Sequence, residues 1–410
     1  MPVRTVVNLW PLFLGLSLIG LAVGVQASLL GFRAELEGFD DGLIGLVMSA
    51  YFAGFLAGSM LAPKLIHQVG HIRTFGAVTA LASITILVHA SFVEPWTWAA
   101  MRLLTGFAFS SIYVVAESWL NQAADNRNRG QLLSIYMVIL LAGTTAGQFM
   151  LNLADPAGFT LFILISIMVS FAAIPILMTV LPAPELEETV RVSVAHLWRR
   201  APMGVIGIVL VQWCTSVVFG MGAVYAAKLG MTVEEVAWFM GSMMAGGMVL
   251  QWPLGKLSDL VDRRWVMGFA SIFAVVAALF AAGETEAGWE MYAYVFLFGG
   301  FCLSQYSLIV ALTHDHLRPA EIVPASGTIV MLSGWVSISG PLMVAFGIGT
   351  FGLYTFFPML AAVLLLMAVI SILRVIFVPA LPQEYKTHST MQAPATPVGS
   401  VLHPEEKEVV

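Results

Sequence analysis

The chain has 410 residues, of which 59% are hydrophobic and only 10% are charged, and its formal net charge is −6. A soluble chain of this length needs far more charge to cover its surface, so the composition excludes a soluble globular protein and predicts a membrane protein. The sequence contains no phosphate-binding loop, cofactor fingerprint, metal-ligand cluster or basic nucleic-acid patch. We therefore expect no enzyme, no cofactor, no metal site and no nucleic-acid partner.

Twelve apolar segments each have about the 20 residues that a helix needs to cross the hydrocarbon of a bilayer. Lipid cannot satisfy backbone polar groups, so such segments must be helices. The first six span residues 9–30, 43–65, 74–92, 96–120, 132–153 and 159–181, and the second six span 203–227, 236–257, 265–282, 291–313, 325–346 and 353–378. The sequence thus predicts an all-α integral membrane protein with twelve transmembrane helices.

The distribution of lysine and arginine predicts the orientation of these helices. An even number of spans puts both termini on one side. With both termini inside, fifteen basic residues lie in the cytoplasm, only Arg33 and Lys228 face outward, and Arg102 lies within a span. Such an excess of basic residues marks the cytoplasmic side. We expect a multi-pass protein of the inner (plasma) membrane with both termini in the cytoplasm.

The spans divide into two halves that resemble each other at an offset of 192 residues, as Ala53-Gly54 and Ala245-Gly246 illustrate. We predict an N-terminal six-helix bundle over residues 1–182, a cytoplasmic linker over 183–202 and a C-terminal six-helix bundle over 203–381. Helical spacing of apolar residues predicts a short amphipathic helix within the linker. Residues 382–410 are rich in proline and charge, which predicts a disordered cytoplasmic tail.

Small residues and a proline recur at corresponding places in the fifth and eleventh spans. Gly143 and Gly147 are four residues apart in the fifth span, and Gly340 precedes Pro341 in the eleventh. Small residues let helices approach closely, and proline bends them. We expect these residues to serve helix packing and bending at the interface between the halves.

A charged turn between the eighth and ninth spans reads Gly255-Lys-Leu-Ser-Asp259-Leu-Val-Asp-Arg263-Arg264. This pattern resembles the signature loop of the major facilitator superfamily (MFS) of secondary transporters. The resemblance implies that Asp259, Arg263 and Arg264 form a cytoplasmic gate, in which the aspartate caps a helix end and pairs across the interface. The equivalent turn in the first half has His67 in place of the aspartate, so two symmetric gates are not expected.

Arg102 lies about six residues inside the fourth span, at a depth where a charge is costly unless it faces a cavity or has a partner. The run Arg102-Leu-Leu-Thr-Gly106 resembles the fourth-helix arginine motif of the same family, which is tied to proton coupling, although Thr105 replaces the usual glutamine. The alternative is an arginine whose side chain extends outward to lipid headgroups.

Glu117 and Tyr113 lie on about the same face of the fourth helix as Arg102, which makes all three candidates for the cavity or for coupling. Glu117 is either a carboxyl group that binds the proton or, as we favour, a partner for the arginines at Arg127 and Arg129. The Glu117-Ser118 pair and the Arg127-Asn-Arg-Gly run, with Gln251-Trp-Pro in the eighth span, resemble the YcaD-like branch of bacterial MFS transporters.

In the MFS fold the first, fourth, seventh and tenth helices line the central cavity. The resemblance therefore implies that the polar residues of these helices are substrate candidates, namely Gln26, Gln212, Gln305 and Tyr306. Each is equally well explained as an interhelical hydrogen-bond partner.

The predicted function is secondary active transport of a small solute across the inner membrane by alternating access, with protons as the expected coupling ion. Because the cavity helices have so few charges, we favour efflux of small amphipathic compounds. Uptake of a small metabolite is the alternative, and a membrane receptor or scaffold that does not transport is the reading from a different class. We expect a monomer whose partners are the bilayer, the solute and protons.

Overall fold

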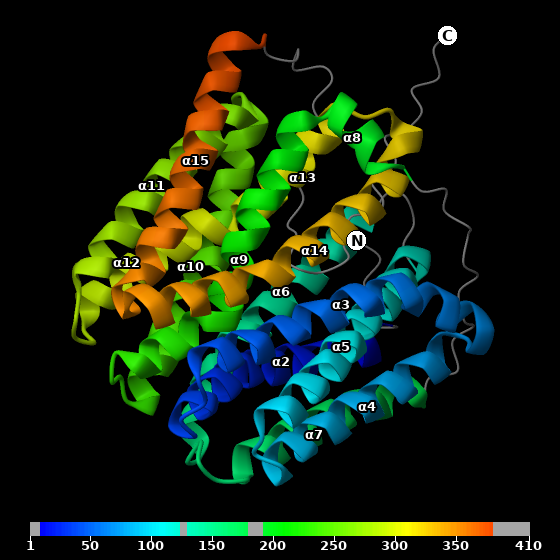
Figure 1. Ribbon diagram of the computed structural model, residues 1–410. Helices are drawn as coiled ribbons and strands as arrows, with labels where there is room; N and C mark the ends of the chain where they lie inside the picture. Colours follow the sequence, from blue (N-terminus) through cyan, green and yellow to red (C-terminus); the bar gives the residue numbers. More distant parts are fainter. Residues whose placement is uncertain (1–8, 124–128, 179–191, 380–410) are drawn as a thin grey trace.

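The computed structural model describes residues 9–123, 129–178 and 192–379, which are almost entirely helical and contain no strand (Figure 1). The first half comprises α2 (Trp10–Leu36), α3 (Asp41–Val69), α4 (His71–Ser91), α5 (Pro95–Ala123), α6 (Arg129–Phe149) with the 3-10 turn η1 (Met150–Leu153), and α7 (Thr160–Leu177). The second half comprises α9 (Pro202–Lys228), α10 (Val233–Leu260), α11 (Arg263–Gly283), α12 (Trp289–Leu303) with α13 (Gln305–Asp315), α14 (Pro319–Phe351), η2 (Leu353–Thr355) and α15 (Phe356–Phe377).

Eleven spans within the described residues are long and apolar enough to cross a membrane, and one of them runs through both α12 and α13. The remaining predicted span is α10, which has 28 residues and therefore sufficient length. Its glycines, Gln251 and Pro253 make it less apolar than the others. The structure thus has the predicted twelve long helical segments, and most extend several residues beyond the predicted apolar cores.

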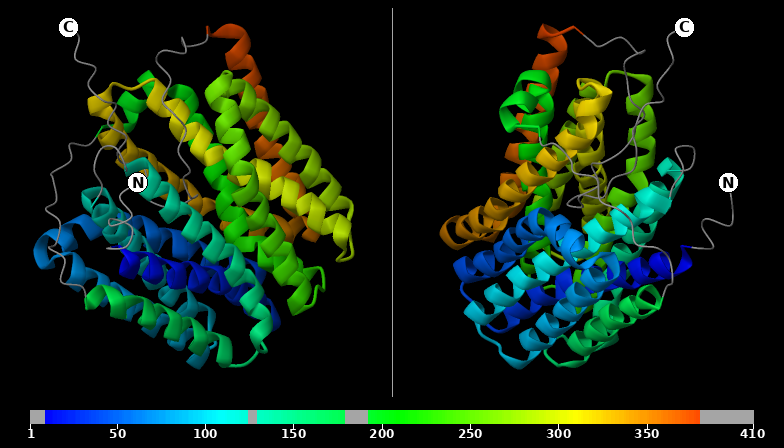
Figure 2. Two further views of the ribbon diagram at one scale, coloured as in Figure 1. Left: turned by 180° about the vertical axis from the view of Figure 1, so that it is seen from behind. Right: turned by 90° about the vertical axis from the view of Figure 1, so that its right-hand side faces the viewer.

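The helices form two bundles that repeat the same packing, coloured from blue to bluish green (α2 to α7) and from green to red (α9 to α15) in Figures 1 and 2. In the first half α3 packs on α5 and α2 on α6, and in the second half α10 packs on α12 and α9 on α14. Across the interface α3 packs on α14 while α10 packs on α6, and α2 packs on α9. This pattern is that of a two-fold pseudosymmetry between two six-helix bundles.

Glycines at equivalent positions allow the closest helix contacts in each half. A Cβ on Gly106 of α5 would overlap the carbonyl oxygen of Tyr51 in α3, and a Cβ on Gly299 of α12 would overlap that of Met243 in α10. Only glycine permits backbones to approach this closely. Gly106 is also the glycine of the arginine motif. The close contact that it allows between α5 and α3 brings Arg102 beside α3.

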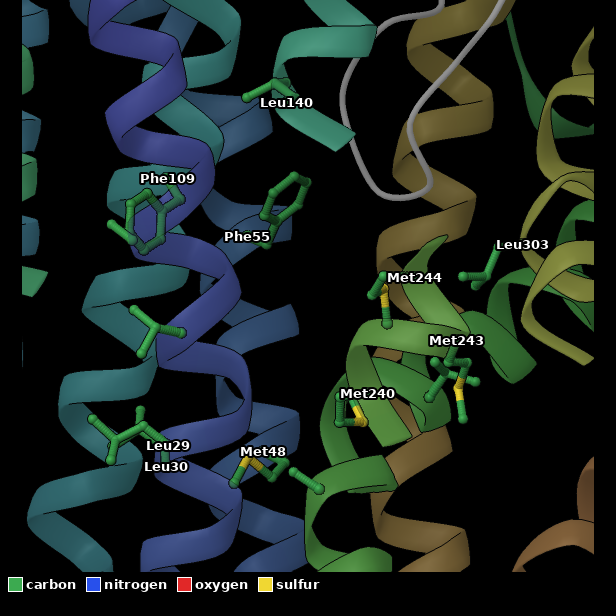
Figure 3. Packing of buried hydrophobic residues seen from close by; sticks show 14 of the residues in the cluster. Leu29, Leu30, Met48, Phe55, Phe109, Leu140, Met240, Met243, Met244 and Leu303 are labelled. Atoms are coloured by element: carbon green, nitrogen blue, oxygen red, sulfur yellow. The ribbon is translucent and has the colours of Figure 1, made fainter. Parts of the chain in front are cut away.

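The halves contact each other at the end of the molecule where α2 ends and α3 begins, which we call the Lys228 end. Here Gly31 of α2 faces Val224 of α9, and Gly45 of α3 faces Ala345 of α14. One cluster of buried apolar residues runs through both halves, and Figure 3 shows Met48 among its members. The opposite end, where α10 ends, is called the Asp259 end.

Two parts of the predicted domain division, 183–191 and 382–410, lie outside the described residues. Within the linker the chain forms α8 (Val194–Arg200), whose N-cap Ser193 accepts a hydrogen bond from the backbone of His196. His196 also bonds Glu321 at the start of α14, at 3.1 Å, which fastens α8 to the second half. The backbone N–H of Arg318, assisted by His196, lowers the pKa of the Glu321 carboxyl.

Candidate functional site

A large cavity lies between the two halves and encloses about 1010 Å³ including its open part. Its walls come from α2, α3, α5 and α6 of the first half and from α9, α10 and α12 of the second. They include more helices than the four expected from the family resemblance. Figure 3 shows two wall residues, Leu140 of α6 and Leu303 of α12, on opposite sides.

The walls are mainly apolar and aromatic, with a small number of polar side chains. The aromatic residues come from both halves and comprise Phe52, Phe55, Phe109, Phe219, Tyr51 and Tyr113. Polar groups are supplied by Gln26, Thr144, Thr145, Gln251 and Arg102. Binding sites for small molecules commonly combine an apolar lining with a few polar groups that fix the orientation of the ligand.

Arg102 lines this cavity and is 5% exposed. Its guanidinium carbon lies 4.4 Å from the centre of the Tyr51 ring, and Nη2 lies 3.9 Å from the sulfur of Met48. Its Nε has no hydrogen-bond partner, and no described oxygen atom accepts from any of its N–H groups. The side chain is therefore turned into the protein, and the alternative of an arginine extended to lipid headgroups is wrong.

Of the four predicted substrate residues, only Gln26 lines the large cavity. It is 2% exposed, and its Nε2 has no hydrogen-bond partner. Gln212 and Tyr306 line a smaller cavity of about 280 Å³ between α3 and the second half. Gln305 accepts a hydrogen bond from Ser271 of α11 at 3.0 Å, which is an interhelical contact.

The other two candidates on α5, Tyr113 and Glu117, differ in whether they line the large cavity. Tyr113 lines the large cavity and packs near Phe55, with ring centres 6.2 Å apart. Glu117 is buried one turn further on and accepts a hydrogen bond from the hydroxyl of Tyr136 at 3.1 Å. It is not among the described cavity walls.

The favoured interpretation of Glu117 as a partner for cytoplasmic arginines finds no support in these contacts. Glu117 forms no ion pair with any described arginine, and the side chains of Arg127 and Arg129 lie outside the described residues. Fifteen residues separate Glu117 from Arg102, which is about 22 Å along the helix. The two residues are thus too distant to contact each other directly.

An ionic cluster joins the halves at the Lys228 end. Lys228, in the last turn of α9, has its Nζ 2.8 Å from Glu35 Oε2 of α2 and 2.8 Å from Asp41 Oδ1 of α3. Arg33, the other basic residue of this end, instead pairs with Glu37 of its own helix and donates to the carbonyl of Pro156. Lys228 is therefore the basic residue that connects the second half to the first here.

At the Asp259 end the signature turn fastens helices of the second half to one another. Arg263 is 1% exposed and donates to Asp315 of α13 at 2.8 Å, to Ser258 at 2.9 Å and to Asp259 at 3.0 Å. Arg264 pairs with Asp262 and donates to the carbonyls of Arg374 and Val378 at the end of α15.

One feature of this turn differs from the expectation. The residue that caps α11 is Asp262, whose side chain accepts from the backbone N–H of Arg264, whereas Asp259 lies within the last turns of α10. The ion pair between Asp259 and Arg263 joins residues of the same half, and the expected pairing of Asp259 across the interface stays a prediction. Asp262 replaces Asp259 as the cap because its extended backbone directs its carboxylate to the first N–H groups of α11.

The predicted packing residues lie mostly within the halves. Gly143 and Gly147 of α6 face Gly20 and Gly24 of α2, which belongs to the same half. Gly340 of α14 faces α9 in the second half.

Of these four packing residues, Pro341 is the one that reaches the interface, because its carbonyl oxygen faces Gly45 of α3. Placing all four at the interface was therefore wrong, since the sequence spacing of small residues does not indicate which helix they face.

Comparison with known proteins places this geometry in a family. The family model described as Major Facilitator Superfamily matches residues 12–341 and 204–405. An uncharacterized MFS-type transporter of Enterobacter sp. is 27% identical over 354 residues, which cover 86% of this chain and 92% of the relative. The uncharacterized MFS-type transporter YcaD of Escherichia fergusonii is 26% identical over 333 residues, covering 81% and 86%.

Solved structures share the fold at low sequence identity. A mutant of the nucleoside transporter NupG superposes with a TM-score of 0.75 at 12% identity, over 90% of this chain and 99% of that one. A bacterial homologue of the human lysosomal transporter Spinster, in an inward-facing and unoccupied conformation, has a TM-score of 0.69 at 14% identity, over 92% and 96%.

Proposed function

The chain belongs to the Major Facilitator Superfamily, and on that premise we propose that it exports small amphipathic compounds across the bacterial inner membrane in exchange for protons. The fold and the family are those of secondary transporters of small solutes. A complete cavity is formed within one chain, which supports a monomer as the transporting unit. The direction of transport and the coupling ion are parts of the proposal.

The observation that carries the proposal is a large cavity between two pseudosymmetric bundles that are joined at one end by an ionic cluster. Lys228 of the second half pairs with Glu35 and Asp41 of the first half at that end. In alternating access each half moves as a body around a central site. The ionic cluster is then a contact of the state whose cavity is closed toward the outside.

Glu117 is the proposed site of proton binding. A carboxyl group that is buried beside the hydroxyl of Tyr136, with no basic partner among the described residues, can gain and lose a proton without breaking an ion pair. Its position on α5, between the cavity and the Asp259 end, lets its protonation influence how the halves meet. Arg102 cannot serve this role, since a guanidinium keeps its charge at every physiological pH.

Proton flux driven by solute in proteoliposomes tests this function. Purified wild-type protein is reconstituted with the pH-sensitive dye pyranine inside, and a panel of neutral, cationic and anionic aromatic compounds is added outside. Exchange predicts that at least one compound moves protons in the direction opposite to its own movement. A Glu117→Gln variant, which keeps an acceptor for Tyr136, should bind the same compound without moving protons.

Liposomes without protein and the Glu117→Gln liposomes control for weak acids and bases that cross lipid unaided. If solute and protons move in the same direction, the result would contradict export in exchange for protons and would favour proton-coupled uptake. A panel in which no compound gives a protein-dependent signal, in either direction and with any gradient, would contradict transport.

A further inference from the structure

Arg102 contrasts with the other buried arginines of this structure in what accepts its hydrogen bonds. Arg263 and Arg264 are buried to a similar degree, and both donate to carboxylates, with Ser258 or backbone carbonyls as additional acceptors. Arg102 donates to no oxygen atom of the described residues, and its Nε is buried without a partner. A guanidinium without acceptors is costly to bury, which points to an acceptor that is supplied from outside the chain.

The neighbours of Arg102 stabilise its charge without satisfying its donors. The face of Tyr51 lies 4.4 Å from the guanidinium carbon, which is within the range of a cation–π contact. An aromatic face has no lone pair for the N–H groups in the guanidinium plane. The sulfur of Met48, at 3.9 Å from Nη2, is a weak acceptor. The planar group is thus held in place while its donors stay available for a bidentate partner.

The charge of the cavity has one sign. Among its described wall residues Arg102 is the only ionised side chain, and none is acidic. A cationic solute would meet an uncompensated positive charge there, and a neutral solute would leave that charge without a counterion. An anionic group would satisfy the donors of Arg102 and its charge together.

We infer that the transported solute is an amphipathic anion, whose carboxylate binds Arg102 and whose apolar or aromatic body lies against the phenylalanine walls. This inference rests on the proposed function and specifies its class of solute. Gln26 supplies a second donor in the same cavity, since its buried Nε2 has no partner in the protein. Phe55, Phe109 and Phe219 supply apolar surface from both halves, so that one bound molecule contacts both.

Matched triplets of compounds separate charge from apolar size. Purified full-length protein is melted with benzoate, indole-3-acetate or 4-phenylbutyrate, with the amide of each, and with an amine of the same size. Inorganic phosphate tests an anion without an apolar body. We expect at least one carboxylate to raise the melting temperature by several degrees at a concentration at which its amide, its amine and phosphate do not.

Variants assign the effect to Arg102. Arg102→Gln should weaken binding of that carboxylate at least tenfold and abolish its preference over the amide, whereas Arg102→Lys should retain part of both. Arg33→Gln removes a charge from a residue of the same half that is not among the cavity walls and should change neither. If Arg102→Gln does not fold, the comparison of acid with amide in the wild type and in Arg102→Lys decides the question.

Three outcomes overturn the anion site. These are binding that ranks by apolar size regardless of charge, failure of every carboxylate to stabilise the protein, and a carboxylate preference that survives in Arg102→Gln. Flux distinguishes this failure from failure of transport. A carboxylate that binds through Arg102 but never crosses the liposome membrane would support the anion site and contradict transport. Transport of only neutral or cationic compounds would support transport and contradict the anion site.

Discussion

Removal of the Lys228 side-chain charge should open the Lys228 end of the protein. Lys228 makes two ion pairs of 2.8 Å with the opposite half, and the three side chains involved are 19%, 27% and 24% exposed. A partly exposed pair contributes about 0.2–1 kcal/mol. In Lys228→Gln the carboxylates of Glu35 and Asp41 are also left facing each other without a counterion. Together these effects amount to about 1.4 kcal/mol, which is a tenfold change in the ratio of two states.

Accessibility of the cavity from the outside measures this ratio. Thr145 lines the cavity, and cysteine is close to threonine in size. The two natural cysteines, Cys214 and Cys302, are buried and are replaced by alanine in the background. A maleimide that cannot cross membranes, applied to intact cells, should label Thr145→Cys about ten times faster when Lys228→Gln is present.

Two further variants make this experiment decisive. Lys228→Arg retains the charge and should label like the wild type. Arg33→Gln removes a charge from the same end of the molecule, but Arg33 pairs with Glu37 at the end of its own helix and not with the opposite half, so it should leave labelling unchanged. Equal labelling rates in Lys228→Gln and the wild type would refute the assignment of Lys228 as the residue that closes this end.

Three further predictions concern folding and orientation. Asp315→Asn should lower the free energy of unfolding by about 3–5 kcal/mol because it leaves the buried guanidinium of Arg263 partly unpaired. Asp259→Asn should lower it much less because the Asp259 side chain is 25% exposed, and thermal denaturation of both variants checks this order. Gly106→Ala should destabilise the protein by about 1–3 kcal/mol through overlap with the Tyr51 carbonyl, and Gly327→Ala, where space is free, should be neutral or stabilising, as the same melting assay would show. Reporter fusions at Asp40 and in the segment after residue 382 should give opposite signals, and equal signals would contradict the twelve-span topology.

The number and length of the helices were predictable because they depend on the hydrophobicity of consecutive residues, which can be summed along the sequence. Apolar length fixed the twelve helical segments, and the six-plus-six division followed from the repeat at Gly54 and Gly246, which indeed occupy equivalent contacts with α5 and α12. The order of packing within each half could not be read from the sequence, because extensive contacts join helices that are not consecutive, such as α3 with α5 and α2 with α6.

The site was less predictable because its contacts join residues far apart in the sequence. Arg102 stood out, since a charge deep in a span is costly wherever it faces, but Tyr51 and Met48 carry no signal that would select them as its neighbours. Lys228 was recognised only as an outward-facing charge, although its two carboxylate partners lie on α2 and α3. Asp315 was not selected from the sequence, although it lies at the end of α13 and accepts a hydrogen bond from the buried Arg263.

Inter-label distances at both ends of the molecule test the central claim, alternating access, most directly. Spin labels at Glu37 and Glu234 report on the Lys228 end, and labels at the exposed residues Gln68 and Leu260 report on the Asp259 end. In the change from the wild type to Lys228→Gln, alternating access predicts that the first distance increases while the second decreases. Distances that both stay fixed, or that increase together, would contradict the claim.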